Sequence, residues 1–125
     1  MTGYIKNIEK ETLENENFRK VLFTGPHSQL VLMSLLPNEE IGMEVHNNVD
    51  QFIRIEEGEG LAILNGEGIP ILDDFAIVIP AGINHNIINT SDSRKMKLYS
   101  IYSPAEHPDG TIDKTKADAS RREGH

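Results

Sequence analysis

Glycine, proline, asparagine and aspartate interrupt this chain so often that every apolar segment between them is short. Short apolar runs separated by turn-forming residues are typical of an all-β domain rather than of long helices. We expect eight or more strands, and a sandwich or barrel closed on itself, because closure removes exposed strand edges. The segments expected to form strands are residues 18–24, 29–36, 41–46, 51–57, 61–64, 69–72, 75–79, 85–89 and 96–102.

Local patterns within these segments carry more detail. In residues 51–57 apolar and polar residues alternate, which predicts Gln51, Ile53 and Ile55 on one face of a strand. Asn65-Gly66 is a strong signal for a tight hairpin, because both central residues of a type I′ turn need positive φ. Residues 75–79 form a continuous apolar run, which predicts a strand buried on both faces.

The 125 residues suit one domain, whose last part differs in composition from the rest. Residues 103–112 are rich in turn formers, and we expect them to pack back on the barrel, anchored by Tyr102 and Ile112. Residues 115–125 are small, charged and polar, and are expected to form a tail. The expected parts of this single domain are N-terminal strands in residues 1–40, a core in residues 41–102, and a C-terminal segment and tail in residues 103–125.

The charge and composition exclude several classes of protein. Twenty acidic residues against twelve basic ones give a net charge of −8, which disfavours binding to nucleic acid or anionic lipid. The absence of cysteine excludes disulfides, thiol catalysis and zinc–thiolate sites. No apolar run approaches the roughly 20 residues of a membrane helix, and the first residues lack the apolar core of a signal peptide. We therefore expect a cytoplasmic protein.

Four polar residues are candidates for a metal site. Glu44 and His46 are two positions apart, so on a strand their side chains point to the same face. Gln51 begins the next strand after a short turn, and His85 opens another strand far along the chain. Two imidazoles, one carboxylate and one amide oxygen form a suitable ligand set for a divalent metal. The alternative, in which Glu44 is solvated and both histidines are ordinary surface or core residues, remains open from spacing alone.

Residues 44–89 resemble a cupin, a small barrel of the double-stranded β-helix or jelly-roll type. The second cupin motif has the form G-x5-P-x-G-x2-H-x3-N, and residues 80–89 match it from Pro80 to Asn89. Within this match, His85 occupies the position of the motif's histidine. Only the leading glycine differs, because Asp74 stands there.

The first cupin motif runs H-x-H, three or four residues, E, six residues, G. Counting back from Gly58 places Gln51 at the glutamate position, His46 at the second histidine and Glu44 at the first. A second register, with His46 first and Asn48 second, shortens the gap to Gln51 to two residues, so the first register is preferred. The spacing of the first motif is thus kept, but Glu44 replaces its first histidine and Gln51 replaces its glutamate.

The resemblance implies one divalent metal ion held by Glu44, His46, Gln51 and His85. Two histidines and one carboxylate resemble the triad that suits iron(II), while manganese, nickel and zinc remain open. In this set Gln51 is either a fourth, weaker ligand or a group that orients Glu44 or a water.

The resemblance also implies a homodimer and a small-molecule ligand or substrate. It points to a small metal-dependent enzyme of oxygenase, isomerase or lyase type; the alternative is a non-catalytic binding module or sensor for a sugar-like or acidic ligand. His107 is a candidate for a second group at the barrel mouth, and Glu57, Tyr99 and Tyr102 are weaker candidates for an acid or base. The candidates to line the pocket, for each of which plain core packing is the favoured alternative, are Met33, Met43, Ile53, Ile55, Ile87, Leu98 and Tyr102.

Overall fold

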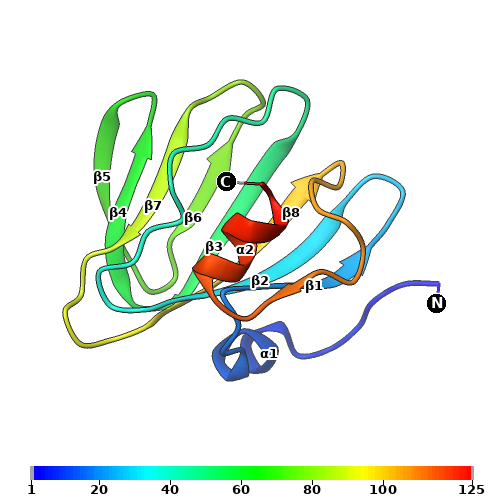
Figure 1. The fold of residues 1–125 in the computed structure, drawn as a ribbon, viewed down its shortest axis with the longest axis horizontal. Coiled ribbons are helices and arrows are strands. Elements are labelled where there is room, and N and C mark those ends of the chain that lie inside the picture. The colour runs from blue at the N-terminus through cyan, green and yellow to red at the C-terminus, as the bar shows by residue number, and fades with distance from the viewer. Residues whose placement is uncertain (1, 125) are drawn as a thin grey trace.

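The computed structural model describes residues 2–124, which form antiparallel strands and two short helices (Figure 1). The predicted all-β class is confirmed, since each helix of this described part has only seven residues. Neither helix is long and apolar enough to cross a membrane. The elements in chain order are α1 (Ile8–Glu14), β1 (Arg19–Thr24), β2 (Gln29–Leu35), β3 (Asp50–Glu57), β4 (Glu59–Leu64), β5 (Glu67–Leu72), β6 (Ala76–Ile79), β7 (His85–Asn89), β8 (Met96–Ser103), β9 (Ile112–Asp113) and α2 (Lys116–Arg122).

The strands form two sheets that enclose one apolar core. The larger sheet has the order β6-β3-β8-β2-β1-β9, and the smaller has the order β5-β4-β7. The core takes side chains from both sheets, such as Ile53 and Leu98 from the larger and Ile87 from the smaller. In Figure 1 the smaller sheet lies to one side of the view, and α2 lies in front of the larger sheet.

Two local predictions are confirmed. In β3, Gln51, Ile53 and Ile55 are buried, as their alternation predicts. Asn65 and Gly66 both have positive φ, 49° and 84°, and they join β4 to β5 as a tight hairpin. The register of the larger sheet then aligns Gln51 with Tyr102 of β8, and Tyr102 with Gln29 of β2. Polar groups on three neighbouring strands therefore share one row facing the interior.

The prediction of a strand at residues 41–46 is wrong. The β-bridge that this segment makes is isolated and joins Glu44 to His85 of β7, while Glu40, just before the segment, makes a second bridge to Ile88. Gly42 has a φ of 106°, a conformation that favours glycine and interrupts the extended backbone. The N–H of Gly42 instead bonds the side-chain Oδ1 of Asn86 at 2.9 Å. The segment still runs beside β7, but as an irregular connection.

The prediction that residues 75–79 are buried on both faces is also wrong. Ile77 and Ile79 are buried, whereas Phe75 and Val78 are exposed. The reason is that the two sheets enclose one core between them, so only one face of β6 meets that core. A continuous apolar run here marks a half-exposed edge strand, not an internal one.

The segment at residues 103–112 packs on the barrel, as predicted. The side-chain amide of Gln29 donates to the backbone carbonyl of His107 at 2.7 Å, and its Oε1 accepts the His107 N–H at 3.0 Å. Tyr102 is buried and anchors the start of the segment, but Ile112 is exposed. The packing of residues 103–112 on the barrel therefore depends on these polar contacts more than on Ile112, the second expected anchor.

The expected tail at residues 115–125 is instead helical where the structure describes it; His125 lies outside the described residues. The Thr115 hydroxyl accepts the N–H of Asp118 at 3.1 Å, and the Asp118 carboxylate accepts the N–H of Thr115 at 3.3 Å. This reciprocal capping satisfies two backbone donors at the start of α2. Ala119 packs into the core, so the helix is held against the barrel.

Candidate metal centre

The structure brings Glu44, His46 and His85 together inside the barrel. One carboxylate oxygen and one nitrogen from each imidazole lie within 4.8 Å of one another. Two backbone hydrogen bonds hold Glu44 beside His85, because each residue donates its N–H to the other's carbonyl at 2.9 Å. The rings of His46 and His85 have centroids 5.3 Å apart. Residues far apart in sequence thus present three donor atoms to one point.

His85 has one ring nitrogen engaged and one free. Its Nδ1 lies 3.0 Å from the carbonyl oxygen of Ile83, which can only accept a hydrogen bond. This contact places the ring proton on Nδ1 and leaves the lone pair of Nε2 available. Nε2 is buried and has no hydrogen-bond partner within residues 2–124. That arrangement is typical of a histidine oriented as a metal ligand.

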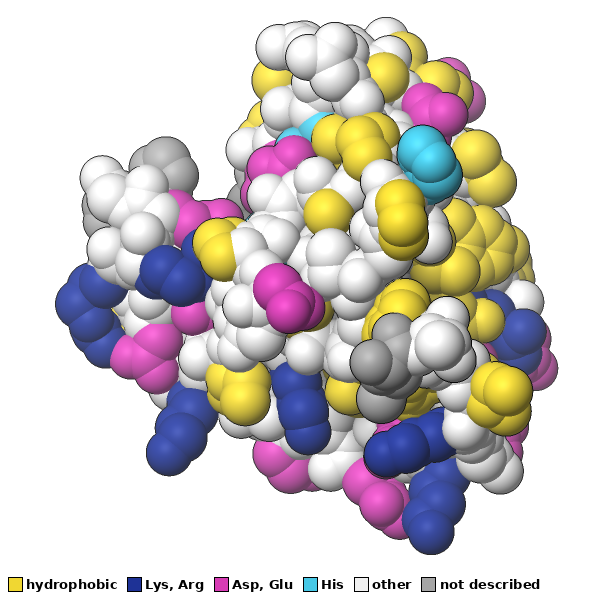
Figure 2. Space-filling view, turned by 90° about the vertical axis from the view of Figure 1, so that its right-hand side faces the viewer, with side chains coloured by type: hydrophobic (Ala, Val, Ile, Leu, Met, Phe, Trp, Pro, Cys, Tyr) yellow, Lys and Arg dark blue, Asp and Glu magenta, His cyan; other side chains and the backbone are white. Residues whose placement is uncertain are grey.

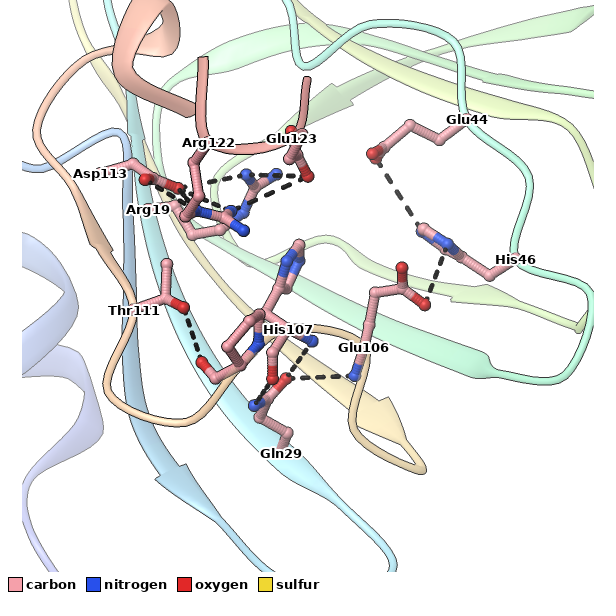
Figure 3. Close-up of polar contacts among 11 residues, drawn as sticks. Arg19, Gln29, Glu44, His46, Glu106, His107, Thr111, Asp113, Arg122 and Glu123 are labelled. Carbon is pink, nitrogen blue, oxygen red and sulfur yellow. Dashed lines mark hydrogen bonds and ion pairs between the residues drawn. The ribbon is translucent and has the colours of Figure 1, made fainter. Parts of the chain in front are cut away.

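His46 lies between two carboxylates. Its Nδ1 is 3.4 Å from Oε1 of Glu106, and its Nε2 is 3.9 Å from Oε1 of Glu44 (Figure 3). The ring also meets Tyr102 edge-on at a centroid distance of 5.9 Å. Its buried Nε2 has no hydrogen-bond partner among the described residues. The Glu106 carboxylate is placed to accept a proton from Nδ1 and to direct Nε2 toward Glu44 and His85.

Gln51, the fourth predicted ligand, lies on β3 beside Tyr102, whose ring contacts that of His46. Its Nε2 donates to the hydroxyl of Ser100 at 2.8 Å, and its buried Oε1 has no partner in the described chain. Leaving buried acceptors unpaired is costly. Like the free nitrogens of His46 and His85, Oε1 is therefore a buried acceptor without a partner among the described residues.

The electrostatics of the cluster also fit a cation. Burial raises the pKa of Glu44, although the nearby charge of His46 opposes this rise. Burial lowers the pKa of His46, although Glu44 opposes this change. Both charged forms are therefore disfavoured in the protein alone. A divalent ion binds a neutral imidazole, which burial already favours at His46, and its positive charge would offset the cost of burying a charged Glu44 carboxylate.

Most residues predicted to line the pocket are core residues of the barrel. Met43 is the exception, because it lies on the irregular segment and is 58% exposed. Of the weaker acid–base candidates, Glu57 is exposed, and Tyr99 stacks near Phe52 with ring centroids 6.2 Å apart. Tyr102 lies at the site. The predicted lining residues that are buried are Met33, Ile53, Ile55, Ile87, Leu98 and Tyr102.

Three further polar residues border the site. His107 was a sequence candidate, and its ring meets Tyr102 edge-on at 5.1 Å. Burial, with the positive charge of Arg19, lowers the pKa of His107 to about 3, so the ring is neutral near pH 7. Sequence reasoning missed Glu106 and Arg19. For Arg19 a signal existed, since it is two positions from Val21 and both face the core on β1.

Comparison with known proteins supports the family suggested by the motifs. The sequence signature of the cupin domain matches residues 31–102. The uncharacterized protein YrkC of Bacillus subtilis (strain 168) is 48% identical over 122 residues, covering 93% of this chain and 65% of that protein. The uncharacterized protein L612 of Acanthamoeba polyphaga mimivirus is 50% identical over 113 residues, covering 88% of this chain and 71% of that protein.

A solved structure extends the comparison to three dimensions. The crystal structure of BH2720 from Bacillus halodurans has a TM-score of 0.92 and 47% sequence identity to this chain. The match covers 94% of this chain and 93% of BH2720. The chain thus matches nearly the whole of BH2720, while it spans only 65% of the length of YrkC.

Proposed function

The chain belongs to the cupin family, and we propose that it is a metal-binding member that works as a small metal-dependent enzyme on a small molecule. The observation that carries the proposal is the convergence of Glu44, His46 and His85 within 4.8 Å. Two neutral imidazoles and one carboxylate suit iron, manganese, nickel or zinc. Gln51 completes the proposed ligand set through its free Oε1.

A divalent metal at this point supplies Lewis-acid or redox chemistry to a bound small molecule. The protein's own residues then have separate tasks. Glu106 holds the His46 ring in one orientation, and the Ile83 carbonyl does the same for His85. The buried rings of Tyr102 and His46 exclude water from one side of the site. Neutral His107 offers a ring nitrogen that can hold or release a hydrogen bond beside the reacting molecule.

The reaction type is of the oxygenase, isomerase or lyase kind. The alternative is a non-catalytic module or sensor that binds a sugar-like or acidic ligand. The buried cation Arg19 near the site favours an acidic molecule in either case. Basic side chains on the outer surface do not gather into a patch on the face seen in Figure 2, where Lys and Arg are interspersed with Asp and Glu.

Metal analysis tests the proposal directly. Protein purified without chelator is expected to carry about one divalent ion per chain, measured by elemental analysis. His46→Ala and His85→Ala should remove the metal while circular dichroism shows the fold retained. His27→Ala is the matched control, because His27 is exposed in the β1–β2 turn and should keep the metal.

Two outcomes separate the alternatives. A wild-type protein that binds no divalent ion at micromolar concentration overturns the metal site. A protein that retains metal and binds small acids, but converts none of them with or without oxygen, supports the binding module over the enzyme.

We further propose a homodimer formed through the outer strands β5 and β6. Each is the edge strand of its sheet, so its backbone is open to pairing with a second copy. An apolar groove of about 200 Å³ lies between these strands, with Ile69, Phe75 and Val78 in its lining. These side chains are 42–65% exposed, so a second copy would cover apolar surface that now meets water.

A further inference from the structure

Arg19 is a charged side chain at an inward position of β1. Its register partners are Met33 on β2 and Asp113 on β9, and its side chain is only 2% exposed. A buried guanidinium is costly unless its charge is compensated and its N–H groups are hydrogen-bonded. For Arg19 the charge is compensated, but the N–H groups are not all hydrogen-bonded.

The charge of Arg19 is compensated by two carboxylates at ion-pair distance. Its Nη1 lies 3.6 Å from Oδ2 of Asp113 and 3.8 Å from Oε2 of Glu123. The Asp113 oxygens are already engaged by Arg122, through three hydrogen bonds of 2.8–3.1 Å. Within residues 2–124, neither Nε nor Nη1 of Arg19 has a hydrogen-bond partner. Arg19 therefore retains unsatisfied buried donors.

These donors lie beside the candidate metal centre. Figure 3 shows the His107 ring between Arg19 on one side and Glu106 with His46 on the other. His107 meets Tyr102 at 5.1 Å, and Tyr102 meets His46 at 5.9 Å. The Nε2 of His107 is also buried and unpaired in the described chain. A metal ion at Glu44, His46 and His85 would leave the free atoms of Arg19 and His107 still without partners.

We propose that Arg19 and His107 form the subsite for a carboxylate group of the substrate, while another oxygen of the same molecule meets the metal. The inference rests on the proposed metal centre and names its substrate class, a small organic acid with a second oxygen ligand. The fork of N–H groups on arginine matches the two oxygens of a carboxylate. His107 supplies a further hydrogen bond from the opposite side.

The surrounding charges favour a carboxylate over a phosphate. Asp113 and Glu123 approach Arg19, and Glu106 and Glu44 flank His46. A phosphate group carrying close to two negative charges meets more repulsion from these carboxylates than a group carrying one. The unpaired N–H groups of Arg19 therefore suit a singly charged carboxylate better than a phosphate.

Glu123 is expected to regulate binding at this subsite by competing for Arg19. Its backbone N–H donates to the carbonyl of Ala119 at the end of α2, and its carboxylate shares Nη1 of Arg19 with Asp113. An incoming carboxylate competes with Glu123 for the same guanidinium. Removing the charge of Glu123 should therefore strengthen binding of the acid without altering the metal ligands.

The test is isothermal titration calorimetry on nickel-loaded protein after its metal content is measured. The probes are malonate, succinate and glutarate, their neutral diamides, and inorganic phosphate. We expect at least one dicarboxylate to bind, its diamide and phosphate to bind more weakly, and Arg19→Gln to reduce affinity about 10- to 100-fold. The nickel content of Arg19→Gln should remain that of the wild type.

Two variants keep the test valid if Arg19→Gln folds poorly. Glu123→Gln should tighten dicarboxylate binding several-fold, because it removes the competitor; its side chain is 28% exposed and tolerates the change. Arg121→Gln is the matched control, since it removes an exposed arginine of the same helix that pairs with Asp118 and leaves Arg19 and its partners in place. It should keep the wild-type affinity for the acid.

The outcomes separate the two proposals. Unchanged affinity in nickel-loaded Arg19→Gln, weaker binding in Glu123→Gln, tighter binding of phosphate, or no dicarboxylate binding to wild type overturns the carboxylate subsite. Failure of wild type to hold nickel overturns the metal proposal instead. In that case binding of a dicarboxylate to metal-free protein, lost in Arg19→Gln, still supports the subsite.

Discussion

The side-chain amide of Gln51 donates a 2.8 Å hydrogen bond to the hydroxyl of Ser100, one strand away on β8. In this arrangement the N–H group of the amide is used and its buried Oε1 has no partner among the described residues. A glutamine at this position is therefore a held acceptor, not a flexible polar residue. Its importance for metal binding can be measured by substitution.

We predict that Gln51→Glu tightens divalent metal binding. The change raises the ligand set from one negative charge to two, and the Ser100 hydroxyl can donate to the new carboxylate. Gln51→Ala should weaken binding by about 10-fold without abolishing it, and Ser100→Ala should weaken it less. Competition with a chromophoric chelator measures all three. A weaker affinity in Gln51→Glu would show that repulsion from Glu44 outweighs the added charge.

The parts of the site that the sequence predicted are those governed by local rules. The second motif places His85 at the start of β7, and the period of two places Gln51 with Ile53 and Ile55 on the inner face of β3. The prediction that Glu44 and His46 point the same way because they lie on one strand was only partly right. The Glu44 side chain reaches His46, but the segment is irregular, so the shared direction does not come from a regular strand.

The remaining residues around the site were not predictable from spacing. Arg19 and Glu106 lie on opposite sides of the two motifs in the sequence, and they meet the site only after β1 and the C-terminal segment join the barrel. Their positions depend on long-range pairing, such as that of Gln29 with the backbone of residues 106 and 107. No local periodicity encodes such a contact.

We predict that Gln29 holds the C-terminal segment on the barrel. Its buried amide accepts the N–H groups of Glu106 and His107 and donates to the His107 carbonyl. Gln29→Leu leaves these backbone groups without partners, which should cost about 2–4 kcal/mol of unfolding free energy. Amide exchange of residues 104–110 should accelerate in the variant. Thr24→Ala is the control, since it removes only one side-chain bond of Gln29. Exchange of residues 104–110 in wild type at the rate of an unprotected backbone would contradict the docking.

We predict that the homodimer depends on the exposed edge formed by β5 and β6. Val78 is 65% exposed on β6, so Val78→Lys should leave the monomer folded while placing a charge in the interface. Sedimentation at micromolar concentration should show a dimer for wild type and a monomer for the variant. Leu36→Lys changes an apolar side chain of similar exposure elsewhere and should remain dimeric. A monomeric wild type would overturn the dimer.

The last prediction concerns acid stability and the ion pairs behind Arg19. Burial alone would raise the pKa of Asp113, but hydrogen bonds from Arg122 and the charges of Arg122 and Arg19 together hold this pKa below its ordinary value. A carboxyl whose folded pKa is lowered contributes stability above its unfolded pKa, about 4. That contribution is lost as the pH falls through the folded pKa.

Asp113→Asn should therefore cost about 3 kcal/mol near pH 7, because it leaves the buried guanidinium of Arg19 poorly compensated. The difference in unfolding free energy between variant and wild type should shrink as the pH falls below about 4, because the unfolded wild-type chain then takes up a proton at Asp113 while the folded protein, with its lowered pKa, does so only at lower pH. Urea unfolding at a series of pH values measures this difference. Comparing the two proteins at each pH cancels the titration of other groups, such as Glu16, whose hydrogen bonds from Lys95 and Lys97 lower its pKa to about 2. A difference that stays constant from pH 7 to pH 3 would show that the charge of Asp113 does not stabilise the fold.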